Sequence, residues 1–127
     1  MNSLIQSNKI EVKKSSIHGY GVFATDSILK GEILEECHFM SIPVDEYENY
    51  NRLIDFVFLY PIDNPTRLAW PFGNGCIYNS SSNPNADWSI DIERKLFIFK
   101  CTTDINKGEE IFTNYTSHMK NFGKKIR

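Results

Sequence analysis

The chain has 127 residues, of which 41% are hydrophobic and 24% are charged. This size and composition are typical of one globular domain and exclude a disordered or fibrous protein. The formal net charge of −2 argues against a general nucleic-acid binder, because such proteins present a strongly basic face. We therefore expect a single domain over residues 1–127, with a core at about 9–115 and a short polar, basic tail at 116–127.

No segment is long and apolar enough to predict a membrane span. The longest nearly apolar run, residues 53–60, is interrupted by Asp55 and falls far short of the roughly 20 residues that a span needs. The N-terminal segment lacks the apolar core of a signal peptide. We expect an intracellular, by default cytoplasmic, protein. Its widely spaced cysteines predict buried free thiols rather than a metal site: Cys37, Cys76 and Cys101.

The N-terminal third predicts a hairpin followed by a turn. Residues 10–13 alternate between apolar and polar, residues 18–21 contain two glycines, and residues 22–24 resume a strand pattern. Segments 25–34 and 103–112 then share Thr-Asp, an isoleucine and Lys-Gly-Glu. We expect each segment to turn at its glycine, Gly31 or Gly108, with a positive φ, and to lead into a strand.

The middle and the end of the chain predict further short strands. Residues 44–51 are acidic and favour a short helix, whereas Phe56, Phe58 and Tyr60 alternate as in a strand. Residues 61–71 contain three prolines and predict a loop. Residues 76–78 predict a short buried strand before a run of turn formers. Residues 88–92 and 96–102 predict a pair of strands around a turn at 93–94.

Three loop-rich segments far apart in the sequence carry the candidate chemistry: HGYG at 18–21, YNSSSNPNA at 78–86 and GEEIFTNY at 108–115. Together they offer close backbone approach at glycines, many amide and hydroxyl groups, and a tyrosine at a strand end. If they converge, they form a site for a polar small molecule.

Taken in this order, the three segments resemble the SET-domain protein-lysine methyltransferases. That family opens with a Gly-x-Gly turn, has an Asn-His-Ser motif followed by Pro-Asn, and closes with Gly-Glu-Glu leading to a tyrosine. The resemblance implies a mainly β, SET-domain (β-clip-like) fold of several short sheets with a C-terminal knot-like crossing and few short helices. It also implies S-adenosylmethionine as cofactor, bound by Gly19, Tyr20, Gly21, Asn79 and Ser80. Ser80 stands where the family usually has histidine.

The same resemblance implies Tyr115 as the catalytic residue and a substrate channel lined by Phe56, Trp88 and Thr113. Ordinary core packing explains Phe56 equally well. The carbonyls of Tyr78 and Phe112 are candidate acceptors for the polarised methyl group. The implied substrate is a lysine-containing protein or peptide, with a homodimer as an open alternative. The competing interpretations are a non-catalytic SET-like binding module that has lost or weakened cofactor use, and a structural β-rich interaction domain.

The acidic side chains are better explained by structure than by chemistry. Glu32, Glu35 and Glu36 could attract a basic peptide, but a solvated face is the favoured interpretation. Glu109 and Glu110 are adjacent on an expected strand, so their side chains point to opposite faces and do not form a catalytic pair. We expect both to occupy turns or solvated edges.

Overall fold

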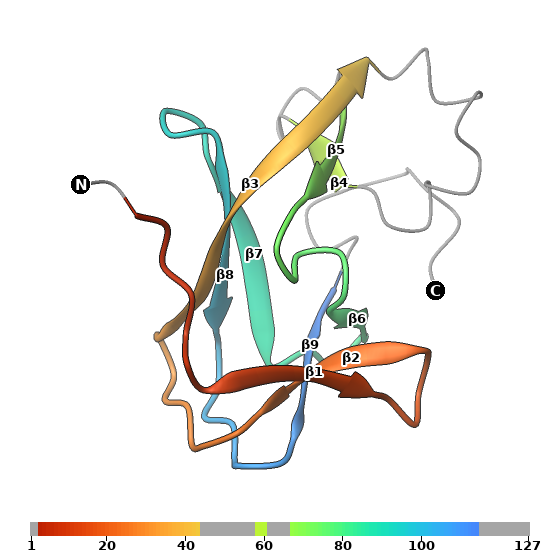
Figure 1. Ribbon diagram of the computed structural model, residues 1–127, viewed down its shortest axis with the longest axis vertical. Coiled ribbons are helices and arrows are strands. Elements are labelled where there is room, and N and C mark those ends of the chain that lie inside the picture. Colours follow the sequence, from red (N-terminus) through yellow and green to blue (C-terminus); the bar gives the residue numbers. More distant parts are fainter. Residues whose placement is uncertain (1–2, 44–57, 61–66, 115–127) are drawn as a thin grey trace.

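The computed structural model describes residues 3–43, 58–60 and 67–114. These residues form strands arranged in two sheets and contain no helix, so none of them forms a helical membrane span. The mainly β fold of several short strands is thereby confirmed (Figure 1). The expected helix at 44–51, Phe56 and the C-terminal segment at 115–127, which would form the crossing, lie outside the described residues.

The first sheet has the order β1-β2-β9-β6 and is assembled from three remote parts of the chain. Strands β1 (Ile10–Lys14) and β2 (Tyr20–Ala24) form the predicted antiparallel hairpin. Strand β9 (Glu110–Thr113) pairs antiparallel with β2, with Val22 opposite Ile111. Strand β6 (Asn79–Ser80) pairs parallel with β9, with Asn79 opposite Phe112. This sheet therefore brings parts of all three candidate segments together.

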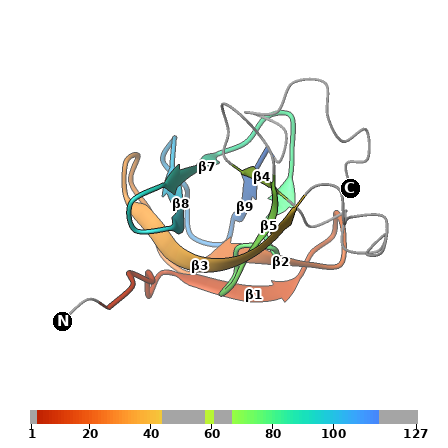
Figure 2. The same ribbon diagram turned by 90° about the horizontal axis from the view of Figure 1, so that it is seen from above.

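The second sheet has the order β4-β5-β3-β8-β7. Its long central strand, β3 (Ile33–Pro43), pairs with β8 (Leu96–Cys101) along its first part and with β5 (Arg67–Pro71) along its second. The outer strands are β4 (Phe58–Tyr60) and β7 (Ala86–Asp91). Figures 1 and 2 show β3 spanning from β8 to β5. The predicted strands around the turn at 93–94 are confirmed.

Two local predictions are wrong. Residues 67–71 are not loop but strand β5, because their backbone pairs with both β3 and β4. Pro71 is the last residue of β5, a strand end where proline is tolerated. Residues 76–78 form turn and bend rather than strand, and β6 begins only at Asn79. The apolar signal there reflects burial, since Tyr78 is fully buried.

The two similar segments, 25–34 and 103–112, contact each other. Ile28 N–H donates to the Ile105 carbonyl at 2.9 Å, and Ile105 N–H donates to the Ile28 carbonyl at 2.8 Å. Both isoleucines are buried. Gly31 and Gly108 have φ values of 95° and 91°, as the turns require. The repeated sequence therefore builds a pair of turns that closes the core at this end.

The core is largely aromatic. Phe58 packs edge-on against Trp88 and Phe97, with ring centroids 4.8 and 5.0 Å apart. Phe99 stacks on Tyr78 at 4.6 Å. Such contacts add to the stabilisation from burial alone. The cysteines are free thiols, with Cys37 and Cys101 buried and Cys76 half-buried.

In the first acidic cluster, Glu32 is half-buried and forms an ion pair with Lys9 at 3.2 Å, and the solvated-face interpretation is wrong for its neighbours. Glu35 and Glu36 are 2% and 7% exposed. Glu36 accepts a hydrogen bond from Ile5 N–H at 3.0 Å and forms an ion pair with Arg94 at 3.0 Å. The N-terminal segment covers this part of β3, since Ile5 and Ser7 bond to its backbone. Sequence patterning cannot reveal that cover.

Candidate functional site

Asn79 connects the three candidate segments. Its side chain is on β6, and its Nδ2 donates to the His18 carbonyl at 3.0 Å, to the Tyr20 carbonyl at 3.3 Å and to Glu110 Oε2 at 2.7 Å. Asn79 is 2% exposed. No residue within 3–43, 58–60 and 67–114 donates a hydrogen bond to the other amide atom, Asn79 Oδ1. One amide thus joins the first, second and third segments and keeps an acceptor atom for a ligand.

Glu110 is a functional-site residue that sequence reasoning missed. Its Oε2 accepts from Asn79, and its Oε1 accepts from the Ser15 hydroxyl at 2.8 Å. The prediction that Glu110 lies at a solvated edge is therefore wrong, because β9 lies between β2 and β6 inside the sheet. Glu109 behaves as expected: it is exposed and accepts from Asn106 N–H in the turn at 2.9 Å. The alternation of strand side chains separates the two carboxylates.

The two glycines of the Gly-x-Gly turn meet different requirements. Gly19 has a φ of 49°, and a Cβ there would meet no atom within 4 Å, so the requirement is conformational. At Gly21 a Cβ would overlap the Glu110 carboxylate and lie 3.0 Å from Asn79 Nδ2. Gly21 therefore lets β2 approach the polar cluster closely. Between them, Tyr20 is 63% exposed, so its ring is available to a ligand.

Ser80 and Thr113 lie opposite each other in the parallel β6–β9 pair. Ser80 is half-buried, whereas Thr113 is completely buried. Among the described residues, the Thr113 hydroxyl is the buried side-chain polar atom that has no hydrogen-bond partner. Buried hydroxyls are normally bonded, so this orphaned group indicates that a ligand or water completes the site.

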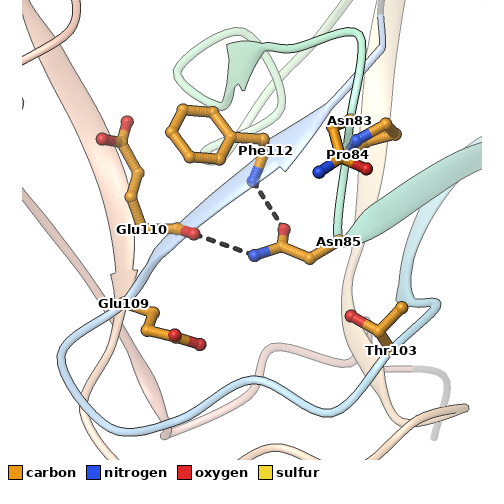
Figure 3. A pocket seen from close by; sticks show the side chains of 7 residues that line it. All are labelled: Asn83, Pro84, Asn85, Thr103, Glu109, Glu110 and Phe112. Atoms are coloured by element: carbon orange, nitrogen blue, oxygen red, sulfur yellow. Dashed lines mark hydrogen bonds between the residues drawn. The ribbon is translucent and has the colours of Figure 1, made fainter.

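Asn85, the asparagine of the Pro-Asn pair, fixes the backbone of β9. Its Nδ2 donates to the Glu110 carbonyl at 3.0 Å and its Oδ1 accepts from Phe112 N–H at 2.8 Å, as Figure 3 shows. The Phe112 carbonyl also accepts from Asn85 N–H at 3.2 Å. That carbonyl therefore already has a partner on the loop. A pocket of about 500 Å³ opens beside the Asn85 side chain. It is lined by Asn83, Pro84, Asn85, Thr103, Glu109, Glu110 and Phe112.

Trp88 lies in the core, next to the backbone that leads into the predicted catalytic tyrosine. It is 1% exposed, and its ring contacts Phe58 and Phe97. The indole Nε1–H donates to the Asn114 carbonyl at 3.0 Å. Asn114 directly precedes Tyr115. Trp88 thus fixes the backbone at Asn114, the last residue that the structure describes.

The comparison with known families agrees with this geometry. The family model for the SET domain matches residues 19–116, which include the Gly-x-Gly turn, Asn79, Glu110 and Tyr115. The chain belongs to the SET-domain family. A solved structure supports the assignment: the crystal structure of a Plasmodium falciparum protein described as a candidate histone methyltransferase shares 34% sequence identity with this SET domain. It has a TM-score of 0.71 and covers 86% of this chain and 94% of that one.

Curated relatives are also similar over most of the SET domain. The histone-lysine N-methyltransferase MEDEA of Arabidopsis thaliana is 32% identical over 124 residues, which is 91% of this chain and 18% of MEDEA. An H3 lysine-37 specific histone-lysine N-methyltransferase of Schizosaccharomyces pombe is 22% identical over 117 residues, covering 87% of this chain and 75% of that protein. The chain therefore spans less than a fifth of the length of MEDEA.

The SET domain places most of the predicted site residues near one another. Gly21, the Tyr20 carbonyl and Asn79 are in contact, and Gly19 begins the same turn. Ser80 follows Asn79 on β6 and faces Thr113. The predicted channel residue Trp88 lies in the core, and the other two predicted site residues, Tyr115 and Phe56, lie outside the described residues. Their roles stay predictions.

Proposed function

We propose that the chain is an S-adenosylmethionine-dependent protein-lysine N-methyltransferase. Membership in the SET-domain family supports this function, as do the relatives named as histone-lysine N-methyltransferases. The observation that carries the proposal is the convergence of three remote segments on the amide of Asn79. Such a convergence of loops on a rigid sheet is typical of a binding site.

The residues around Asn79 suit the proposed cofactor. S-adenosylmethionine, when bound, supplies a methyl group activated by an adjacent sulfonium. The Asn79 Oδ1, which no described residue donates to, would accept from the cofactor's ammonium group. Backbone groups of Gly19 to Gly21 and Ser80 would line the same site, and the exposed Tyr20 ring would offer an apolar surface. Ser80 would contact the cofactor through its main chain, without the imidazole ring of the histidine that the family usually has there.

The second requirement is a neutral lysine side chain, because an ammonium group has no free electron pair for attack. A free lysine has a pKa of about 10.4, so deprotonation at pH 7 costs about 5 kcal/mol. A dry channel would lower the pKa of the substrate lysine by disfavouring the charged form. The buried Thr113 hydroxyl, which lacks a partner, would hydrogen-bond to the lysine amine or to a water beside it.

Tyr115 is the proposed catalytic residue. Its hydroxyl would orient the reacting groups by hydrogen bonding without adding a fixed negative charge. The bond from Trp88 to the Asn114 carbonyl supports this role, because it holds the residue that precedes Tyr115. Phe56 and Trp88 would bound the channel that receives the lysine stem.

Transfer of a radiolabelled methyl group from S-adenosylmethionine to histones and to a lysine peptide library tests the function. We expect labelling by the wild type and a loss of about a hundredfold or more in Tyr115→Phe. Cofactor binding is measured in parallel by calorimetry. Binding without labelling of any substrate would favour the non-catalytic SET-like binding module, and the absence of both binding and labelling would refute the proposal.

A further inference from the structure

Asn79, Glu110 and Gly21 form the Asn79 cluster. A second buried polar cluster surrounds Glu35 on β3 and is joined to the first through Tyr78, the residue before Asn79. Glu35 is 2% exposed. Its Oε1 accepts from the Tyr78 hydroxyl at 2.6 Å, and its Oε2 accepts from Asn74 N–H at 3.1 Å and from the Cys37 thiol at 3.3 Å. A carboxylate buried this deeply is stable only when donors satisfy it. All three partners here are donors.

The protonation states of the Tyr78 hydroxyl and the Cys37 thiol follow from their surroundings. Burial raises the pKa of Tyr78 well above its ordinary value, and the nearby Glu35 raises it further. Burial, followed by Glu35, also raises the pKa of Cys37. Both groups therefore keep their protons across the neutral range, and the Glu35 oxygens act as the acceptors.

The cluster ties the segment that leads into β6 onto β3. Phe72 N–H donates to the His38 carbonyl at 2.8 Å. Gly73 has a φ of 71°, and a Cβ at this position would lie 2.7 Å from Glu35 Oε2. Tyr78, the residue before Asn79, completes the tie from its side chain. Residues 72–78 are thus held at both ends by the second sheet, and the next residue enters the first sheet.

We propose that Glu35 is a positioning residue, which acts through Tyr78 to hold the Asn79 amide against the carbonyls of His18 and Tyr20. This inference rests on the proposed function, since Asn79 is the residue proposed to contact the cofactor. Tyr78 and Asn79 are adjacent, so a displacement of the Tyr78 backbone moves the Asn79 side chain directly. Glu35 itself has no bond to the proposed cofactor residues among the described part of the chain.

Calorimetric titration with S-adenosylmethionine of three variants tests the proposal. Tyr78→Phe removes one hydroxyl and keeps the ring on Phe99; we expect cofactor binding to weaken about tenfold, the change that one hydrogen bond to a charged group produces. In Glu35→Gln, the affinity for S-adenosylmethionine should stay within about threefold of the wild-type value. The Tyr78 hydroxyl can rotate and accept from the new amide, whose oxygen keeps the Asn74 N–H and the Cys37 thiol.

Ile28→Val is the control for lost stability, because Ile28 is buried in the turn pair and its backbone bonds to Ile105 rather than to either cluster. Binding should be unchanged in this variant at a temperature where all proteins are folded. Wild-type affinity in Tyr78→Phe, or an equal loss of affinity in Ile28→Val, would overturn the positioning role.

A measurement without cofactor separates this proposal from the proposed function. In ¹⁵N-labelled protein, the two Nδ2 protons of Asn79 are protected by their acceptors, and we expect their solvent exchange to rise about tenfold in Tyr78→Phe but not in Ile28→Val. If the wild type binds no S-adenosylmethionine, the proposed function fails, yet this exchange test still decides the positioning role. Unchanged exchange in Tyr78→Phe would refute it.

Discussion

Two carboxylates, Glu35 and Glu110, accept hydrogen bonds from the adjacent residues Tyr78 and Asn79, and each carboxylate has similar neighbours. Glu35 in the second sheet accepts from Tyr78, and Glu110 in the first sheet accepts from Asn79. Each carboxylate also lies against a glycine that leaves no room for a side chain, Gly73 beside Glu35 and Gly21 beside Glu110. Two adjacent residues of one segment thus hold two sheets through the same type of contact.

The clusters differ in what remains open. Around Glu35 the donors are satisfied by the carboxylate, and Glu35 is 2% exposed. Around Glu110, Asn79 Oδ1 accepts from no described residue, and the adjoining Tyr20 ring is exposed. A closed cluster contributes to stability and geometry, whereas an open one can bind a ligand. Changes in the Glu35 cluster should therefore lower stability first, and changes in the Glu110 cluster should lower ligand affinity first.

The largest effect is expected from Asn79→Ala in the open cluster. The change removes the proposed cofactor acceptor and the donor to Glu110, so we expect S-adenosylmethionine binding to fall about a hundredfold or more. The free energy of unfolding should fall by only about 1–2 kcal/mol. Calorimetric titration and urea unfolding measure the two effects.

Asn106→Ala is the matched control for Asn79→Ala, because Asn106 is an exposed asparagine of the turn before β9. It should leave both quantities unchanged. A large loss of stability in Asn79→Ala without a loss of affinity would reverse the assignment of the open cluster.

The next effect is expected from Gly73→Ala in the closed cluster. Gly73 has a φ of 71°, and a Cβ there would lie 2.7 Å from Glu35 Oε2. A non-glycine residue in this conformation costs about 1–3 kcal/mol, and overpacking adds about 1–3 kcal/mol. We expect urea unfolding to show a loss of about 3 kcal/mol.

Gly31→Ala separates the two causes of that loss. Gly31 has a φ of 95°, but a Cβ there would meet no atom within 4 Å. Gly31→Ala should therefore show only the conformational cost, and the difference between the variants measures the contact with Glu35. Equal losses in the two variants would show that the contact contributes nothing.

The closed cluster is also the part of the site that the sequence predicted least. The hairpin at 10–24, the β7–β8 pair and the turns at Gly31 and Gly108 follow from alternation and turn chemistry, which act between neighbours in sequence. The burial of Glu35 depends on strands and turns far away in the chain. Nothing in the local pattern around Glu35 distinguishes it from a solvated glutamate.

The open cluster could be predicted further, because its parts lie in recognisable motifs. Gly19, Gly21 and Asn79 were identified from the resemblance to the SET-domain family, and the structure brings Gly21 into contact with Asn79. Glu110 was missed because β9 lies inside the sheet, with β2 on one side and β6 on the other. The parallel β6–β9 pairing that creates this position joins segments about thirty residues apart, and no local signal specifies it.

A smaller effect is expected from Tyr78→Phe at alkaline pH. The Tyr78 pKa is raised in the folded protein above its ordinary value of 10.0, so the folded state holds this proton more tightly than the unfolded state. The resulting stability is fully present below about pH 10 and is lost as pH rises further. Tyr78→Phe should flatten the alkaline part of the stability profile, measured by urea unfolding above pH 10.

Tyr20→Phe is the control for the alkaline profile, because the Tyr20 side chain is 63% exposed. It should retain the wild-type dependence on pH. If Tyr78→Phe also retained it, the alkaline loss of stability would not come from the buried Tyr78 hydroxyl.

The smallest effect is expected from Glu32→Gln, outside both clusters. Hydrogen bonding to the Leu29 N–H, followed by bonding to Lys9, lowers the pKa of Glu32 below its ordinary value of 4.5. The contribution is present above about pH 4.5 and is lost as pH falls through the lower folded value, so Glu32→Gln should flatten the acid limb of the stability profile without changing cofactor binding. Because the backbone bond is the larger cause, Lys9→Gln should flatten that limb less than Glu32→Gln. An equal flattening would assign the effect to the Lys9–Glu32 ion pair, and only then should added salt abolish it.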